Sequence, residues 1–196
     1  MSGHNVPKPA AAAGGSERGS RPQTSRNTLT PLETDVPAAV ITVSTRCANG
    51  EREDKSGPVA VSELAQWRIV SPDPVVVPGK VDAVRAAIAE AIAGGARFIL
   101  TTGGTGVTRE DVAPEACEAL IAQRLWNIET QILLRGLENT PLAGLSRAIV
   151  GIVREGSDSG VVLANAPGSR GGVKDTVAIV APLFPNLLEQ LDNPEI

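Results

Sequence analysis

Aromatic side chains are scarce in this chain of 196 residues, which has two Phe, two Trp and no Tyr. Proteins that bind single-stranded nucleic acid stack bases on aromatic rings, so this scarcity argues against that class. A net charge of −4 and the lack of a long basic cluster argue against any nucleic-acid partner. An apolar fraction of 42% can still fill a core. That core must be aliphatic, which suits strands that are buried on both faces.

Metal-binding and redox side chains are also few. The only His is His4, and the two cysteines, Cys47 and Cys117, lie far apart in the sequence. This pattern excludes a Cys/His zinc cluster, a disulfide framework and a histidine-activated nucleophile in the folded part. No apolar run reaches the ~18 residues of a membrane-spanning helix, and the N-terminus does not resemble a signal peptide. We therefore expect a cytoplasmic protein with no membrane partner.

The chain divides into a tail and one domain. Residues 1–37 are rich in Pro, Ala, Gly, Ser, Arg and Thr and have almost no large aliphatic residues, so we expect a disordered tail. The folded domain is expected at 38–191. Its strands are predicted at 38–44, 75–77, 97–102, 148–154 and 160–164. Its helices are predicted at 59–67, 80–93, 114–124, 127–137 and 173–191, with Pro182 and Pro185 kinking or splitting the last one. The alternation predicts an α/β fold with a mainly parallel sheet covered on both faces, and one antiparallel pair within 148–164.

The third predicted strand runs into a glycine-rich loop that starts at Thr101 and Thr102 and ends at an acid, Asp111. Glycines there let the backbone adopt positive φ and turn its N–H groups toward an anion. The residues with these roles are Thr102, Gly103, Gly104, Thr105 and Gly106. Asp111 could hold a metal ion or a ligand hydroxyl. The alternative is an ordinary strand-to-helix turn that binds nothing.

A second glycine-rich loop, 165–172, also lies between a strand and a helix. Two such loops gather at one edge of an open sheet and can hold two anionic groups. Ser44 ends the first strand at the same edge. Neither loop matches the P-loop or the dinucleotide-binding fingerprint. Arg147 either binds a phosphate or pairs with a surface carboxylate, and capping of a helix explains Ser56.

Four motifs in this order resemble the molybdenum-cofactor biosynthesis family of the Mog/MoaB type. They are Thr101–Gly106 with Asp111, Pro114 and Glu115; Asp54–Pro58; Thr140-Pro141 with Leu145-Ser146-Arg147 and Gly151; and Asn165–Ser169 with Gly171–Val173 and Asp175. The likeness covers about residues 38–191. It implies the molybdopterin-binding fold, a three-layer α/β/α sandwich that is commonly trimeric.

The resemblance also implies an activity, the Mg²⁺-ATP-dependent adenylylation of molybdopterin. On this sequence Asp111 would help to place the metal and ATP, and residues 103–106 would supply backbone donors. The residues implied to seat the pterin and its phosphate are Ser146, Arg147, Pro167, Gly168 and Ser169. A homotrimer or a dimer of trimers is expected, with other molybdenum-cofactor synthesis proteins as further partners.

The sequence departs from the family pattern at three places that bear on the site. Members typically carry an acid in a Pro-Asp pair after the second strand, where this chain has Pro78-Gly79; Asp82 is the candidate substitute. Ala166 and Arg170 replace a leucine and a proline of the second loop. These changes leave two alternatives open beside the enzyme: a catalytically silent pterin-binding or assembly protein of the same fold, and a plain phosphoanion-binding module.

Overall fold

The computed structural model describes residues 30–154 and 160–193. Its strands are β1 (Val36–Val43), β2 (Ile69–Val70), β3 (Val75–Val77), β4 (Phe98–Thr102), β5 (Ile121–Arg124), β6 (Val150–Val153) and β7 (Val161–Ala166). Its helices are α1 (Thr45–Ala48), α2 (Gly57–Ala65), α3 (Val81–Ala93), α4 (Ala113–Glu118), α5 (Trp126–Asn139), the 3-10 helix η1 (Pro141–Leu145) and α6 (Arg170–Asp192). None of these helices is long and apolar enough to cross a membrane.

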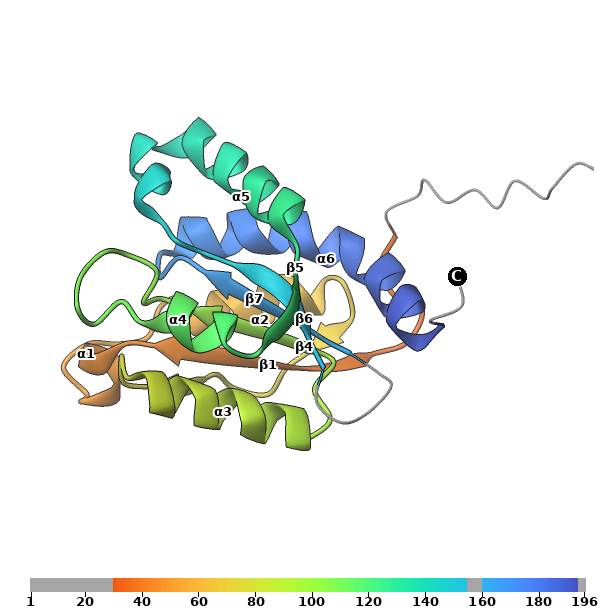
Figure 1. Ribbon diagram of the computed structural model, residues 1–196, viewed down its shortest axis with the longest axis horizontal. Helices are drawn as coiled ribbons and strands as arrows, with labels where there is room; N and C mark the ends of the chain where they lie inside the picture. Colours follow the sequence, from red (N-terminus) through yellow and green to blue (C-terminus); the bar gives the residue numbers. More distant parts are fainter. Residues whose placement is uncertain (1–29, 155–159, 194–196) are drawn as a thin grey trace, which may run out of the picture.

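The strands form one mixed sheet in the order β2-β1-β4-β7-β6-β5. β3 pairs with the C-terminal end of β1. β1 is parallel to β2, β3 and β4, and β4 is parallel to β7. β6 runs antiparallel to both of its neighbours. The predicted parallel sheet with an antiparallel pair is therefore confirmed. Its parallel strands β1, β3, β4 and β7 all end at the same edge, on the left of Figure 1.

Successive side chains of the strands point to opposite faces of the sheet and belong to two hydrophobic layers. On one face, α2, α5 and α6 cover Val40, Phe98, Leu100 and Val162. On the other face, α3 and α4 cover Ile41, Ile99 and Leu163. This is the three-layer sandwich that the resemblance implied, and Figure 1 shows α3 and α6 on opposite sides of the sheet.

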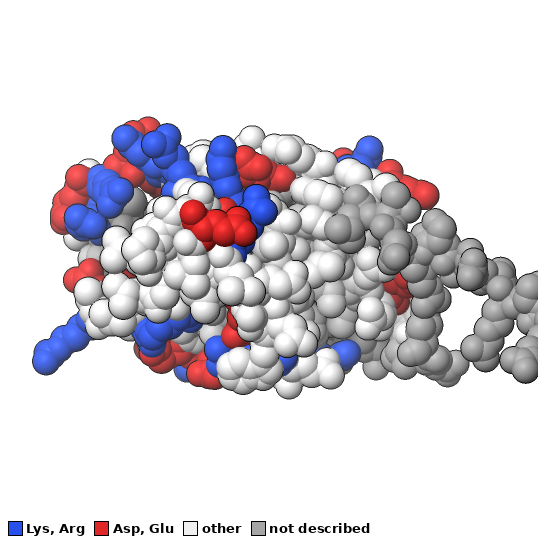
Figure 2. Space-filling view, turned by 90° about the horizontal axis from the view of Figure 1, so that it is seen from above, with Lys and Arg blue, Asp and Glu red and all other residues white. Residues whose placement is uncertain are grey.

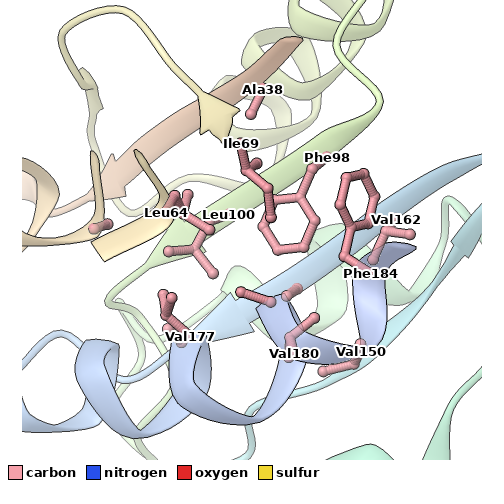
Figure 3. Packing of buried hydrophobic residues seen from close by; sticks show 14 of the residues in the cluster. Ala38, Leu64, Ile69, Phe98, Leu100, Val150, Val162, Val177, Val180 and Phe184 are labelled. Carbon is pink, nitrogen blue, oxygen red and sulfur yellow. The ribbon is translucent and has the colours of Figure 1, made fainter. Parts of the chain in front are cut away.

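The two phenylalanines of the chain meet at the centre of the first layer. Phe98 of β4 and Phe184 of α6 pack edge to face, with ring centroids 5.1 Å apart and an interplanar angle of 80° (Figure 3). Aliphatic side chains surround them, as a core with few aromatics requires. This packing fixes α6 against β4 and so fixes the start of α6 beside the end of that strand.

Two predictions about helices need correction. Residues 114–124 do not form one helix: α4 ends at Glu118, and residues 121–124 form the edge strand β5, which hydrogen-bonds to β6. Pro182 and Pro185 do not split α6, which runs unbroken over 23 residues. Buried packing of Val180, Ala181 and Phe184 outweighs the hydrogen bonds that these prolines cannot donate.

The domain begins earlier than predicted. Val36 and Pro37 already belong to β1, because they pair with Ile69 and Val70 of the short strand β2. We had predicted no strand at residues 69–70. Residues 1–29 of the predicted disordered tail lie outside the described residues, as does most of the turn predicted between β6 and β7.

Candidate functional site

The two glycine-rich loops touch each other at the ends of β4 and β7. The hydroxyl of Thr102 donates to the carbonyl of Pro167 at 3.1 Å, and the N–H of Gly103 donates to the carbonyl of Ala166 at 2.9 Å. A Cβ atom at Gly168 would lie 3.0 Å from the Cα of Gly103. The two loops therefore form one continuous wall at the carboxyl edge of the sheet.

Gly103 and Gly104 both occupy the left-handed region, with φ of +93° and +62°. At Gly103 a Cβ atom would also lie 2.5 Å from the carbonyl oxygen of Val43. A side chain there is excluded twice, by conformation and by space. Glycine at this position lets the loop turn sharply away from β4 while lying against the end of β1.

A cavity of about 610 Å³ opens in front of this wall. It is bounded by the ends of β1 and β4, by the segment before α2, by Gly79, and by parts of both glycine loops. Seven of the sequence-predicted site residues line it: Ser44, Thr102, Gly103, Gly104, Asp111, Gly168 and Ser169. Figure 2 shows acidic and basic side chains crowded at this end of the molecule, the left end of the view.

A second cavity, of about 800 Å³, lies beside the first, between the C-terminal part of α5, η1 and the start of α6. Thr105, Gly106, Ser146 and Pro167 line it. Its wall combines aliphatic side chains (Ile132, Leu133, Leu142, Ala143, Leu145) with polar and charged ones, among them Glu129, Arg135, Asn139, Lys174 and Asp175. Ser169 borders both cavities, so the second glycine loop is the partition between them.

Asp111 is held by a tight turn of its own loop. Its Oδ2 accepts from the N–H of Thr108 at 2.9 Å and from the hydroxyl of Thr108 at 2.6 Å. Burial raises the pKa of this carboxyl, but the hydrogen bonds from Thr108 and Gly106 outweigh it and hold the pKa below its ordinary value. Asp111 therefore carries a fixed negative charge into the first cavity at neutral pH.

Arg147 braces this loop from outside both cavities. Its Nε donates to the carbonyl of Gly106 at 2.7 Å and its Nη2 to the carbonyl of Asp111 at 2.5 Å, while Nη1 pairs with Glu115. The hydrogen bond from Arg147 also lowers the pKa of the Glu115 carboxyl. Of the two readings of Arg147 that we left open, the structure shows the pairing with a carboxylate. Two guanidinium nitrogens therefore hold the loop that carries Asp111, and the third ties Arg147 to α4.

Asp54 is a residue of the first cavity that our reading of the sequence missed. Its Oδ2 accepts from the hydroxyl of Thr42 at 2.7 Å, and its Oδ1 accepts from the N–H groups of Ser56 and Gly57, both at 3.0 Å. Burial raises the pKa of Asp54, and these hydrogen bonds together bring it below the ordinary value. We had expected Ser56 to cap α2, but its side chain makes no capping hydrogen bond. The carboxylate of Asp54 accepts from the first N–H groups instead. The signal was an aspartate two residues before Ser56, within the motif Asp54–Pro58.

Gly79 lies in the first cavity wall, whereas Asp82 lines neither cavity. Asp82 sits in the first turn of α3, so the structure does not bring it to the site. A Cβ atom at Gly79 would lie 2.6 Å from the carbonyl oxygen of Glu110. The loop that carries Asp111 therefore occupies the space that a side chain at position 79 would need.

The described residues contain no group of three or more His, Cys, Asp or Glu side chains that could hold a metal ion. Mg²⁺, however, is commonly held by one or two carboxylates together with substrate phosphates. Asp111 suits that arrangement. Burial raises the pKa of the Cys117 thiol to about 12, so this cysteine is not a nucleophile.

Residues 39–186 match the family described as "Probable molybdopterin binding domain". The molybdopterin adenylyltransferase of Pyrococcus furiosus is 39% identical over 148 residues, which cover 72% of this chain and 82% of that protein. Gephyrin of Dictyostelium discoideum is 31% identical over 160 residues, and the match spans only 21% of its length.

Among solved structures, a molybdopterin biosynthesis protein from Mycobacterium abscessus superposes with a TM-score of 0.73 at 37% identity, covering 82% of this chain and 99% of the other. The family match and this superposition agree with the four motifs of the sequence. The chain belongs to the family of molybdopterin-binding domains found in molybdenum-cofactor biosynthesis proteins.

Proposed function

We propose that this chain catalyses the Mg²⁺-ATP-dependent adenylylation of molybdopterin. The observation that carries the proposal is the pair of adjoining cavities that share Ser169. A reaction between two phosphate-bearing substrates needs two sites that meet at the reacting atoms. The relative from Pyrococcus furiosus bears the name of this activity.

The first cavity suits ATP and the second suits the pterin. The first is lined by polar and charged groups and by backbone of the first glycine loop, as a triphosphate requires. The second combines an aliphatic wall, which can flank a flat ring, with polar groups at its edge, among them Asp175, which accepts from Asn139 and pairs with Arg135. Ser169, between them, would contact the phosphate of molybdopterin.

In the reaction, a phosphate oxygen of molybdopterin attacks the α-phosphorus of ATP. One P–O bond forms there while the bond to the β-phosphate breaks, so adenylylated molybdopterin and pyrophosphate result. Catalysis of this kind is mainly positioning and neutralisation of charge. Mg²⁺ would bring positive charge to the phosphates. Asp111 would orient the metal-bound nucleotide, and Gly103 and Gly104 would fix the phosphates against the wall.

A product assay tests this function. The protein is incubated with molybdopterin, ATP and MgCl₂, and adenylylated molybdopterin and pyrophosphate are quantified. Asp111→Asn should lower the rate by roughly 100-fold or more, because it removes the charge while its oxygen can still accept from Thr108. Asp73→Ala, an exposed acid outside both cavities, should leave the rate unchanged. No product, or full activity of Asp111→Asn, would contradict the proposal.

The second candidate is a silent protein that binds molybdopterin without using ATP, and Gly79 is the observation that favours it. Calorimetry distinguishes the two functions. Binding of molybdopterin with no Mg²⁺-dependent binding of ATP supports the silent protein, whereas tight ATP binding with turnover supports the enzyme.

We also propose that the chain works as a homotrimer. Trp126, Leu134 and Leu137 of α5 expose 61%, 58% and 42% of their surface and line neither cavity. Figure 2 shows a broad uncharged surface in the centre of the view. Light scattering should give three times the mass of the chain, and Leu134→Glu should lower it; a monomeric wild-type protein would contradict the proposal.

A further inference from the structure

Arg170 is a cation at the first cavity that the proposed mechanism does not yet use. It is the first residue of α6, it is exposed, and its side chain lines the first cavity. It forms no ion pair with any residue in 30–154 or 160–193. Arg147, by contrast, uses three guanidinium nitrogens within the protein. The guanidinium of Arg170 is therefore available to a ligand.

The stability of α6 does not explain an arginine at this position. A helix N-terminus carries partial positive charge, so a cation there is unfavourable and an acid is preferred. Ser169 already caps the helix by accepting from the N–H of Gly172 at 3.0 Å. The N–H groups of Arg170 and Gly171 have no hydrogen-bond partner among the described residues. The open N–H group and the unpaired guanidinium of Arg170 thus lie together at the first cavity, whereas Gly171 lines the second.

The carboxylates that line the first cavity form no ion pair with Arg170. Asp54 accepts from Thr42 of β1 and from Ser56, Asp111 accepts from Thr108, and Glu53 lies 3.9 Å from Lys55. Arg46 and Arg52, which line the same cavity, also form no ion pair with a described residue. Several phosphates entering this cavity would find unpaired guanidinium groups around them.

Position 79 limits how many acids can face those phosphates. A side chain there would collide with the carbonyl of Glu110, so this part of the wall provides backbone only. With fewer carboxylates to hold a divalent cation, the charge of the phosphates must be neutralised in another way. Arginine is well suited, because its planar fork binds two phosphate oxygens at once.

We propose that Arg170 contacts the phosphates of the nucleotide in the first cavity and supplies charge that a metal ion would otherwise provide. The inference rests on the proposed function only in that the ligand is a nucleoside triphosphate. Its consequence is that the first cavity binds ATP appreciably without a divalent cation. Arg170 then sets the affinity for the phosphates, while Asp111 and the metal serve the chemical step.

Calorimetric titration of the full chain with ATP and with adenosine, each in EDTA and in MgCl₂, tests this. Loss of a charge-assisted phosphate contact should make Arg170→Ala bind ATP about tenfold more weakly in EDTA. Its affinity for adenosine should not change, because adenosine has no phosphate. Arg170→Lys should keep most of the ATP affinity. Arg154→Ala, an exposed arginine at the other edge of the sheet, is the matched control and should bind as wild type.

Three results would overturn the inference: equal ATP binding by Arg170→Ala and wild type in EDTA, an equal loss of adenosine binding, or no ATP binding by wild type in EDTA. Product formation by wild type in MgCl₂ tests the proposed function separately. If product forms but Arg170→Ala binds ATP as wild type does, this inference fails and the function stands. If no product forms while Arg170→Ala loses ATP binding selectively, the function fails and this inference stands.

Discussion

The two glycine-rich loops occupy equivalent places, at the ends of the adjacent parallel strands β4 and β7, yet they are held in different ways. The first loop depends on glycines at positive φ and on Arg147, which donates to the carbonyls of Gly106 and Asp111. The second depends on neutral groups, the cap of α6 and the contact of Thr102 with Pro167. Its own arginine, Arg170, is unpaired among the described residues. The first loop is thus held in one conformation, whereas the arginine of the second loop is available to a ligand.

The variant Gly103→Ala, in the first loop, tests this difference between the loops with the largest expected effect. The new Cβ would meet the carbonyl of Val43, and alanine would have to adopt positive φ. We expect the free energy of unfolding to fall by about 3 kcal/mol, as measured by urea denaturation. Gly144→Ala, where the Cβ meets open space, should change it by less than about 0.5 kcal/mol. Equal stability of the two variants would show that the first loop is not sterically fixed.

Removal of the brace should have the next largest effect. In Arg147→Lys, one ammonium group cannot replace donors to Gly106, Asp111 and Glu115 together. Misplacement of Asp111 should lower kcat of adenylyl transfer about 30-fold, with a smaller change in the KM for ATP. Arg170→Ala should show the opposite pattern, a change in KM with kcat retained. If both variants affect KM alone, the two loops do not differ in role.

Gly79→Asp restores the acid that the family pattern has and should nonetheless fail to raise activity. The added side chain must push against the carbonyl of Glu110 and so against the loop of Asp111. We expect a loss of stability of about 2 kcal/mol and a lower kcat than wild type. A stable variant with higher activity would show that position 79 is open to a side chain.

The smallest effect concerns pH. The hydrogen bond from Arg147 lowers the pKa of Glu115 in the folded protein below its ordinary value of 4.5. A lowered carboxyl pKa stabilises the fold above the ordinary value, and this contribution is lost as the pH falls through the folded-state pKa. Wild type should thus be slightly more stable than Glu115→Gln at pH 7, and the difference should shrink below pH 4.5. A difference that grows on acidification would contradict the pairing.

Much of this architecture could be predicted from the sequence, because hydrophobic runs and glycine positions report on local structure. The strands that end at Val43, Val77 and Thr102, and the glycine loop after the last of them, are cases where the local pattern was sufficient. β5 was missed because Ile121–Arg124 is an edge strand in which no residue is fully buried and burial does not alternate. Its identity comes from pairing with β6, which a local pattern does not contain.

The positions of the candidate site residues in the fold were predictable, but their contacts were less so. The motifs brought together Asp111, the first loop and the second loop, yet they did not reveal that two cavities meet at Ser169. The brace by Arg147 and the cap by Asp54 depend on side chains reaching across the fold. Sequence spacing alone fixes neither, since each requires the direction of a side chain in three dimensions.

The most direct test of the account is a crystal structure of the protein with ATP and MgCl₂. We expect the triphosphate in the first cavity, against Gly103, Gly104 and the start of α6. The guanidinium of Arg170 should bind a phosphate oxygen, and Arg147 should still be bound to the loop. Phosphates bound in the second cavity, or Arg147 released onto the nucleotide while Arg170 points to solvent, would contradict it.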